Sequence, residues 1–457
     1  MNIWWIRRDL RLEDNQALTA ALKAGTGVLP VFILDEQLLA MPAEKRKGFL
    51  FAGLRAMDDD LRHLGSGLII RRGDPVVELP RLVEESGASS VFAEEDVSPY
   101  SLRRDAAVAQ VLDLRRVHGM GIHPVSAISR TDGKPYTIFT PFSRAWKALP
   151  FSEQTLPAPT MLPPIPDLPS VTLPNLPAPD AFQAGEQEAR HRLNAFLDGP
   201  IYDYSDGRNR LDLDGTSTLS PYMRFGMLSA SQVAAAARQA ARLAPDAQSR
   251  VGCEAWVNEL IWREFYQSIL YHFPYVLKTA FRPSLRSIHW RDAPQDLQAW
   301  QAGLTGYPVV DAGMRQLAET GWMHNRARMI TASFLVKHLL INWQEGEDWF
   351  MRMLVDGDPA ANNGGWQWTA GTGTDAAPYF RIFNPILQGK KFDPEGNYVR
   401  RWVPELADVP RKIIHTPWEM SAADQRASSA IIGRDYPAPI VEHNFARQRT
   451  LMAYSGK

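Results

Sequence analysis

A proline-dense stretch, Pro150 to Pro179, divides this chain of 457 residues into two parts with different patterning. Proline has no backbone N–H and a fixed φ, so this stretch cannot be helical and is expected to run extended over the surface. Short apolar runs alternate with helical patterns before it, and helical patterns dominate after it. We therefore predict a first domain over 1–130, a proline-rich connector over 131–185 and a second domain over 186–457.

The first domain is predicted to be a doubly wound α/β fold built on a parallel sheet. Apolar runs bounded by turn residues mark candidate strands at Asn2–Ile6, Val28–Leu34, Leu68–Ile70, Ser90–Ala93 and Gly121–Val125. Helical spacing separates them, at 44–64, after the capping pair Asp74-Pro75, and at 102–118. Strands that alternate with helices favour a parallel sheet.

Charged residues follow several of these strands, at the carboxyl ends where such sheets bind ligands. Arg7 and Arg8 follow the first strand, Asp35 the second, and Glu94-Glu95-Asp96 the fourth. No Gly-x-Gly-x-x-Gly follows the first strand, which argues against a dinucleotide site in this domain.

The second domain is predicted to be all-helical. Helical patterns occur at 186–198, 229–243, 252–272, 294–302, 308–320, 322–341, 345–355 and 441–454. Three of the 14 tryptophans lie before residue 180, and the others lie from Trp256 onward. This asymmetry indicates that the chemistry belongs to the C-terminal half.

Composition narrows the classes of protein. The net charge of -1 gives no global attraction to nucleic acid, so a nucleic-acid partner would need a local basic surface. The single cysteine, Cys253, excludes an intrachain disulfide framework and fits a reducing cytosol. No apolar run reaches about 18 residues and the N-terminus shows no secretory h-region. We therefore expect a cytoplasmic protein with no membrane span and no metal site.

The stretch Asp356 to Trp368, DGDPAANNGGWQW, combines carboxylates, paired amides, glycines and tryptophans. Buried Asp and Asn are costly unless they are hydrogen-bonded, so this set indicates a bound polar and aromatic molecule. A capped helix start, with Asp358 as N-cap and Pro359 at the first position, is the alternative. It explains neither the paired Asn nor the tryptophans. If the segment is extended, Trp366 and Trp368 point to opposite faces.

Two further stretches combine polar groups with aromatic ones. TSTLSP at 216–221 places four hydroxyls before a helix that Pro221 can start, which suits a diphosphate or simply a capped loop. In CEAWVNELIWREFYQSILY, the side chains of Glu259, Trp262, Arg263 and Tyr266 share one helical face. That face lines an internal cavity or is a solvated ion-paired stripe; the opposite face is also apolar, which favours the cavity.

The chain closely resembles the class I cyclobutane pyrimidine dimer photolyases of bacteria, in the cryptochrome/photolyase family. The resemblance covers essentially the whole chain. It rests on WWIRRDLRLEDNQAL, DGTSTLSPYMRFG, NELIWREFY, TGYPVVDAGMRQLAETGWMHNRARMITASFLVKHLLI and DGDPAANNGGWQWTAGTGTDAAPYFRIFNP. It implies an N-terminal α/β antenna domain and a C-terminal all-helical domain that binds FAD.

The resemblance also implies site residues. The flavin contacts would be Tyr204, Thr216, Ser217, Thr218, Leu219, Ser220, Trp256, Glu259, Arg263, Tyr266, Asn325, Asp356, Gly357, Asp358 and Asn362. Trp366, Trp343 and Trp290 would pass electrons to the flavin. DNA and the flipped dimer would meet Arg208, Glu259, Trp262, Asn325, Arg326, Met329, Trp368 and Gln388.

The implied activity is that of a deoxyribodipyrimidine photo-lyase, a light-dependent carbon–carbon lyase. An electron would pass from excited, fully reduced FAD to a pyrimidine dimer flipped out of DNA, with Glu259 hydrogen-bonded to the dimer bases. Asn362 matches the residue beside flavin N5 and favours repair over plant-type signalling. The family is usually monomeric, and no obligate protein partner is expected.

The resemblance leaves the antenna chromophore open. Pro99-Tyr100-Ser101-Leu102-Arg103 stands where folate-binding members carry Asn-Glu, which argues against methenyltetrahydrofolate. The segment from Asp96 to Tyr100 looks more like deazaflavin-binding members. We expect 8-hydroxy-5-deazaflavin, with FMN or an empty site as alternatives.

Three rival functions are considered. A blue-light cryptochrome is disfavoured by Asn362, Met329 and the Trp262/Trp368 pair. A (6-4) photolyase would carry His at the position of Met329. A flavoprotein that only transfers electrons would leave the flanking arginines and Trp262 without a purpose.

Overall fold

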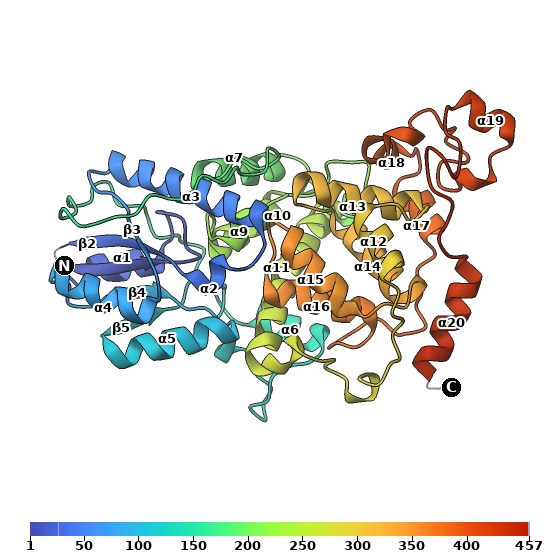
Figure 1. Cartoon of the computed structure of the whole chain (residues 1–457). Helices are drawn as coiled ribbons and strands as arrows, with labels where there is room; N and C mark the ends of the chain where they lie inside the picture. Colours follow the sequence, from blue (N-terminus) through green and yellow to red (C-terminus); the bar gives the residue numbers. More distant parts are fainter. Residues whose placement is uncertain (26, 456–457) are drawn as a thin grey trace. The chain divides into compact units, whose positions relative to one another are not determined.

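The computed structural model describes residues 1–25 and 27–455. Its N-terminal part holds a parallel sheet in the order β3-β2-β1-β4-β5 (Figure 1). The strands are β1 Asn2–Ile6, β2 Val28–Leu34, β3 Ile69–Arg72, β4 Val91–Glu94 and β5 Leu114–Val117. All residues of β1 and β2 are buried, as expected when helices cover both faces of a parallel sheet. The predicted doubly wound fold is confirmed.

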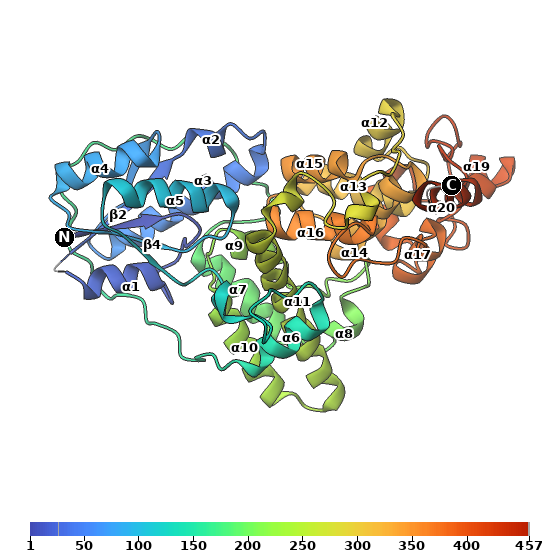
Figure 2. The same ribbon diagram turned by 90° about the horizontal axis from the view of Figure 1, so that it is seen from below.

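Helices α4 Pro75–Ser86 and α5 Pro99–Val111 cover the face of the sheet that carries Ile3 and Trp5. Helix α1 Gln16–Lys23 packs against the opposite face (Figure 2). The other helices of this part are α2 Glu36–Leu39 and α3 Glu44–His63. Asp74 caps α4 as predicted, because its side chain accepts a hydrogen bond from Val76 N.

The predicted fifth strand, Gly121–Val125, is wrong. Helix α5 ends at Val111, seven residues before the end of the predicted helix 102–118, and Leu114–Val117 pair with β4. Leu112 is already extended, at φ -157° and ψ 168°. Pairing with the free edge of β4 outweighs local helical spacing here, and a pairing partner is a tertiary effect that spacing does not encode.

The connector is bound to the end of α3 and to the edge of the sheet. Leu162 N donates to Leu64 O at 2.8 Å, and Val171 N donates to Ile70 O at 2.9 Å. Ile70 N in turn donates to Ser170 Oγ at 2.9 Å. Because β3 is an edge strand, the connector satisfies backbone groups that would otherwise be open to pairing with another chain.

One helix, α6 Phe139–Ala148, lies inside the predicted connector and was not anticipated. Phe139, Phe142 and Trp146 recur at three- and four-residue spacing and face α11 Ala247–His272. The prediction of an extended, non-helical chain is therefore correct for residues 150–179, but it does not hold for the segment 139–148.

The remaining long elements of the described residues are helices, and the sequence patterns place most of them well. They are α7 Glu186–Leu197, α8 Tyr204–Gly207, α9 Ser220–Arg224, α10 Ala230–Leu243, α12 Pro294–Ala302, α13 Pro308–Thr320, α14 Asn325–Ser333, α15 Trp343–Met353, α16 Pro359–Ala370, α17 Pro385–Phe392, α18 Asn397–Trp402, α19 Ala422–Ala427 and α20 His443–Ser455. The predicted helix 322–341 is α14 followed by a π-helical turn, Phe334–His338. The segment with Trp366 and Trp368 is helical, so the extended alternative is wrong.

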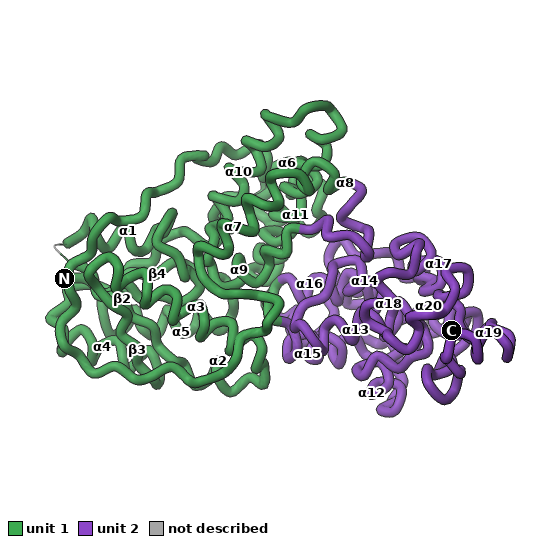
Figure 3. Tube along the Cα trace, turned by 90° about the horizontal axis from the view of Figure 1, so that it is seen from above, with its two compact units in different colours: residues 1–205, 217–274, 355–360 green, residues 206–216, 275–354, 361–457 purple. Residues whose placement is uncertain are grey.

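The described chain groups into two compact units, coloured separately in Figure 3. The first unit contains 1–205, 217–274 and 355–360, and the second contains 206–216, 275–354 and 361–457. These units are groups of contacting residues, and the predicted domain boundaries at 130 and 185 stay a prediction. In the described ranges, no helix is long and apolar enough to cross a membrane, and no cluster of His, Cys, Asp and Glu could hold a metal ion.

We predict that Gly226→Ala destabilises the protein by about 2–4 kcal/mol. Gly226 has φ 65°, and an added Cβ would overlap the carbonyl oxygen of Arg8. Its neighbour Phe225 accepts a hydrogen bond from Leu10 N at 3.0 Å, so this loop cannot shift freely. Urea unfolding measures the effect. Gly199→Ala is the matched control, because an added Cβ there meets no atom within 4 Å; equal effects of both substitutions would contradict the prediction.

Candidate functional site

Helix α11 presents the face that the sequence spacing singled out. Glu259, Trp262, Arg263 and Tyr266 are half-buried, whereas the other side of the helix is buried. Asp246 caps this 26-residue helix by accepting a hydrogen bond from Ser249 N at 2.8 Å. The four side chains therefore lie together on one rigid element.

Two more predicted flavin residues meet on the first unit. The rings of Tyr204 and Trp256 both pack on Phe196, with centroid distances of 5.8 and 5.0 Å. Both side chains are buried, at 8% and 4% exposure. The structure thus places Tyr204 beside the N-terminal half of α11, as expected if Tyr204 and Trp256 belong to one aromatic wall.

The ring of Trp262 is held by aromatic neighbours. Phe139 stacks on it with centroids 3.7 Å apart and an interplanar angle of 2°. Phe265 meets the indole edge-on at 5.5 Å, and Tyr266 lies at 5.5 Å with a tilt of 32°. The sequence spacing found Trp262 and Tyr266, but it gave no signal for Phe139.

Asp358 takes part in an ion-paired cluster at the carboxyl end of the sheet. Arg8 Nη2 donates to Asp358 Oδ2 at 2.8 Å, and Arg8 Nη1 lies 3.4 Å from Asp96 Oδ2. Asp358 also caps α16, because its Oδ1 accepts from Ala360 N at 2.9 Å. Burial alone would raise the pKa of Asp96, but Arg8, the backbone N–H of Ser98 and the neighbouring arginines together lower it. The Asp96 carboxylate is therefore ionised at neutral pH.

Three further arginines surround this cluster. Arg224 Nε donates to Gly357 O at 2.8 Å, while its Nη1 is buried without a hydrogen-bond partner in the described structure. Burial, reinforced by Arg8, lowers the pKa of Arg224 to about 9. Burial lowers the pKa of Arg46 to about 10, although Asp356 and Asp358 oppose it. Arg263 donates to Met120 O at 3.1 Å. The guanidinium groups of Arg46 and Arg224 therefore remain charged at pH 7.

Part of the hydroxyl-rich loop Thr216–Ser220 has defined contacts in the structure. Thr218 has φ 50°, and its Oγ1 accepts a hydrogen bond from Arg192 Nη1 at 3.3 Å. Leu219 is buried, and α9 begins at Ser220 with Pro221 in its first turn, as predicted. Ser217–Ser220 belong to the first unit and Thr216 to the second.

The paired amides of α16 bind backbone and side-chain groups of the second unit. Asn362 Nδ2 donates to Glu347 O at 3.0 Å. Asn363 Nδ2 donates to Glu347 Oε1 at 2.9 Å and to Val276 O at 3.0 Å. Asn363 is thus a structural amide. Asn362 commits its nitrogen to the backbone, so its side-chain oxygen is the atom that it can present to a ligand.

The three predicted electron-transfer tryptophans lie in one apolar cluster. Trp366 and Trp343 are buried in it, at 2% and 3% exposure, and Trp290 packs against it. Trp366 lies against Gly346, where an added Cβ would overlap its ring. The Nε1 of Trp366 is buried without a hydrogen-bond partner among the described residues. A buried donor of this kind is expected where a polar ligand is to bind.

Predicted DNA-binding arginines also come close together. Arg326 pairs with Asn209 and stacks over the Phe392 ring at 4.5 Å. Burial lowers the pKa of Arg326, and the charges of Arg208 and Arg381 lower it further. Arg381 is exposed and was not singled out from the sequence. These arginines form the local basic surface that a nucleic-acid partner would need.

The other predicted residues of the second unit are distributed along its helices. Asn325 is exposed and begins α14, while Met329 is half-buried one turn later. Trp368 is half-buried on α16, and Gln388 lies on α17 with Oε1 buried and unpartnered in the described structure. Asn325 and Met329 are one turn apart on the same helix, as the spacing predicted.

Comparison with known proteins identifies the family. Residues 2–164 match the family described as DNA photolyase, and residues 256–456 match the FAD binding domain of DNA photolyase. The deoxyribodipyrimidine photo-lyase of Halobacterium salinarum is 40% identical over 481 residues, covering 99% of this chain and 98% of its own. The chain belongs to the DNA photolyase family.

Solved structures agree on the fold and differ in class. A bacterial class III photolyase from Agrobacterium tumefaciens has a TM-score of 0.94 at 39% identity, covering 100% of this chain and 97% of that chain. A Synechocystis sp. PCC6803 cryptochrome has a TM-score of 0.89 at 28% identity, covering 99% of each chain. A Sulfolobus tokodaii photolyase with two FAD molecules has a TM-score of 0.84 at 31% identity, covering 100% of each. Photolyase family membership is confirmed, and the class I assignment stays a prediction.

The relatives confirm the prediction of a photo-lyase enzyme with an FAD-binding domain.

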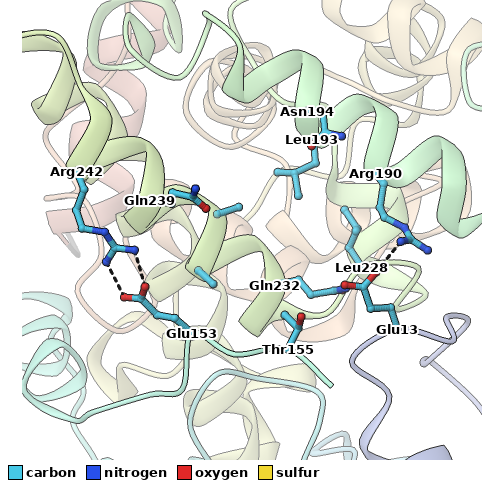
Figure 4. Close-up of a pocket in the computed structure, with 12 residues that line it drawn as sticks. Glu13, Glu153, Thr155, Arg190, Leu193, Asn194, Leu228, Gln232, Gln239 and Arg242 are labelled. Atoms are coloured by element: carbon cyan, nitrogen blue, oxygen red, sulfur yellow. Dashed lines mark hydrogen bonds and ion pairs between the residues drawn. The ribbon is translucent and has the colours of Figure 1, made fainter. Parts of the chain in front are cut away.

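A separate cavity of about 270 Å³ lies in the first unit (Figure 4). It is lined by Glu13, Glu153, Thr155, Arg190, Leu193, Asn194, Leu228, Gln232, Ala235, Ala236, Gln239 and Arg242. Its charged groups pair with one another, Arg242 with Glu153 and Arg190 with Glu13, both at 2.6 Å. None of the predicted site residues lines it.

We predict that Glu347→Gln changes the pH dependence of stability. Burial raises the pKa of Glu347 to about 7, although Asn363 opposes this. Stability from a carboxyl with a raised pKa is fully present below its unfolded value and is lost as pH rises through about 7. The variant should therefore match the natural protein at pH 5 and exceed it in unfolding midpoint at pH 8. Urea unfolding at both pH values, with exposed Glu345→Gln as control, tests this; parallel profiles would contradict it.

Proposed function

We propose that the protein repairs cyclobutane pyrimidine dimers in DNA with blue light. The half-buried face of α11 carries this proposal. It combines two aromatic rings, a carboxylate and a guanidinium on one rigid helix. Those groups suit a planar flavin and a damaged base better than they suit a solvated surface.

FAD is the cofactor that the family supports, and the residues present fit it. Bound and fully reduced, it would supply the electron that splits the dimer when light is absorbed. The side-chain oxygen of Asn362 would accept a hydrogen bond from a protonated flavin nitrogen, and the unpartnered Nε1 of Trp366 would donate one. The remainder of the FAD molecule would be held by Tyr204, Trp256, Arg263 and the Thr216–Ser220 loop. Trp343 and Trp290 would extend electron transfer from Trp366 toward solvent.

The dimer would be bound outside the duplex. For base-flipping enzymes as a class, photolyases among them, extrusion costs a few kcal/mol and least for damaged bases. Trp262 and Trp368 would supply aromatic faces, each contributing about 1–3 kcal/mol per base. Glu259 and Asn325 would hydrogen-bond the bases, and Met329 would pack against them.

The basic surface would bind the DNA backbone. Arg208, Arg326 and Arg381 together would neutralise phosphates near the flipped dimer, and Gln388 would face the DNA. Each phosphate contact displaces counterions, so affinity should fall steeply as salt rises. A flavoprotein that only transfers electrons would not need this surface.

Met329 and Asn362 favour dimer repair over the alternatives. A (6-4) photolyase would need a proton donor where Met329 stands, and thioether sulfur has no proton to give. The cryptochrome likeness keeps signalling as the second candidate. Within the photolyases we propose class I, with class III as the alternative raised by the Agrobacterium tumefaciens structure.

We further propose a second chromophore at the carboxyl end of the sheet, bounded by Asp35, Asp96 and Tyr100. The hydroxyl of Tyr100 donates to Asp35, so this end already carries an ordered polar network. 8-Hydroxy-5-deazaflavin is the first candidate and FMN the next. The photolyase with two FAD molecules adds FAD itself. We propose a cytoplasmic monomer without an obligate protein partner.

Repair of an oligonucleotide with one thymine cyclobutane dimer tests the function. The photoreduced protein should remove the dimer in blue light and leave it in the dark. Trp262→Ala with Trp368→Ala should abolish repair, because both stacking faces are lost. Trp262→Phe with Trp368→Phe is the matched control and should retain most of it.

A parallel oligonucleotide with one (6-4) lesion separates the alternatives. Absence of dimer repair by protein with fully reduced flavin would overturn the proposal. Signalling would then be favoured if neither lesion is repaired, and (6-4) repair if only that lesion is. Retained repair in the double alanine variant would remove the stacking role and leave the activity standing.

A further inference from the structure

We infer that Phe139 is a positioning residue for dimer recognition: it backs the ring of Trp262 and fixes the orientation of that stacking face. This inference rests on the proposed function, in which Trp262 binds the flipped dimer. Phe139 lies in α6, a helix that sequence spacing did not assign to any site.

The stack is close and nearly parallel. The Phe139 and Trp262 centroids lie 3.7 Å apart at 2°, whereas most of the aromatic pairs in this structure are tilted or edge-to-face. Aromatic pairs generally prefer offset or T-shaped geometry, because two ring faces carry like partial charge. The surrounding packing therefore imposes the face-to-face arrangement on these two rings.

That packing anchors α6 on α11. Trp146 is 1% exposed, and its Nε1 donates to Glu264 Oε2 at 2.7 Å. The other oxygen of Glu264 accepts from Ile122 N at 2.5 Å. Phe142, also 1% exposed, meets Phe265 at 5.3 Å. Because α6 is fixed at two buried points, its first residue, Phe139, is delivered to Trp262 in a set position.

The consequence for recognition follows from ring geometry. An indole can stack on a base only if its plane is set, and a half-buried tryptophan on a helix has several rotamers to choose from. A second ring pressed against one face removes that freedom and leaves the remaining surface for a ligand. Phe139 would thus improve binding of a flipped dimer without touching DNA phosphates.

Binding measurements on five variants of the full FAD-loaded protein test this. The dissociation constant is measured for one oligonucleotide with a thymine cyclobutane dimer and for the same oligonucleotide without damage. Phe139→Leu and Phe139→Ala should weaken dimer binding about 3- to 10-fold and leave undamaged DNA unchanged, which lowers discrimination. This change in the dissociation constant corresponds to the interaction free energy of one aromatic pair. Phe139→Tyr keeps the ring and should restore discrimination.

Phe142→Leu is the matched control, since it loosens α6 without removing a ring from Trp262. A merely structural role would show as equal losses in Phe139→Leu and Phe142→Leu, on both oligonucleotides and in FAD content, and would overturn the inference. Tighter dimer binding by Phe139→Ala would overturn it too, because Phe139 would then cover the substrate face. Trp262→Ala separates the two proposals: if it keeps discrimination while the natural protein repairs dimers, the inference fails and the activity stands. If the natural protein neither discriminates nor repairs, both fail.

Discussion

The ion pair between Arg8 and Asp358 joins residues that are 350 positions apart and brings residues 355–360 into the first unit. Arg8 follows β1, the central strand, at the point where the strand order reverses. Asp358 is the cap of α16, the helix that carries Asn362, Trp366 and Trp368. The Asp358 carboxylate thus fixes where residues 355–360 contact the sheet, and it also fixes where α16 begins.

Stability alone does not account for an ionic contact at this place. A buried ion pair often contributes little net free energy, because desolvating both charges offsets their attraction, but breaking one partner is costly. What the pair provides is a unique arrangement, since Asp358 also accepts from Ala360 N and Arg224 binds the adjacent carbonyl of Gly357. An apolar contact here could slide, whereas directed hydrogen bonds fix the register of the segment.

The sequence predicts those parts of the fold whose stabilising contacts repeat locally. Strands β1 and β2 and helices α12 and α13 were placed at their observed bounds. The strands and α13 bury most of their residues, and both helices begin with a proline and end at a glycine. Strand β5 was missed because its stabilising partner is the edge of β4, which no local period reveals. Helix α6 was missed because it is short and its packing partner, α11, is distant in the sequence.

The same distinction between local patterns and long-range contacts applies to the candidate site. Spacing on α11 placed Glu259, Trp262, Arg263 and Tyr266 on one face, since four residues of one helix define their own geometry. It could not find Phe139, which reaches Trp262 from a helix more than a hundred residues earlier. The buried carboxylate of Glu264 makes that contact specific, because it binds both Trp146 and the backbone of Ile122. The same helix therefore uses one side to hold its aromatic support and the other to present the residues that the support orients.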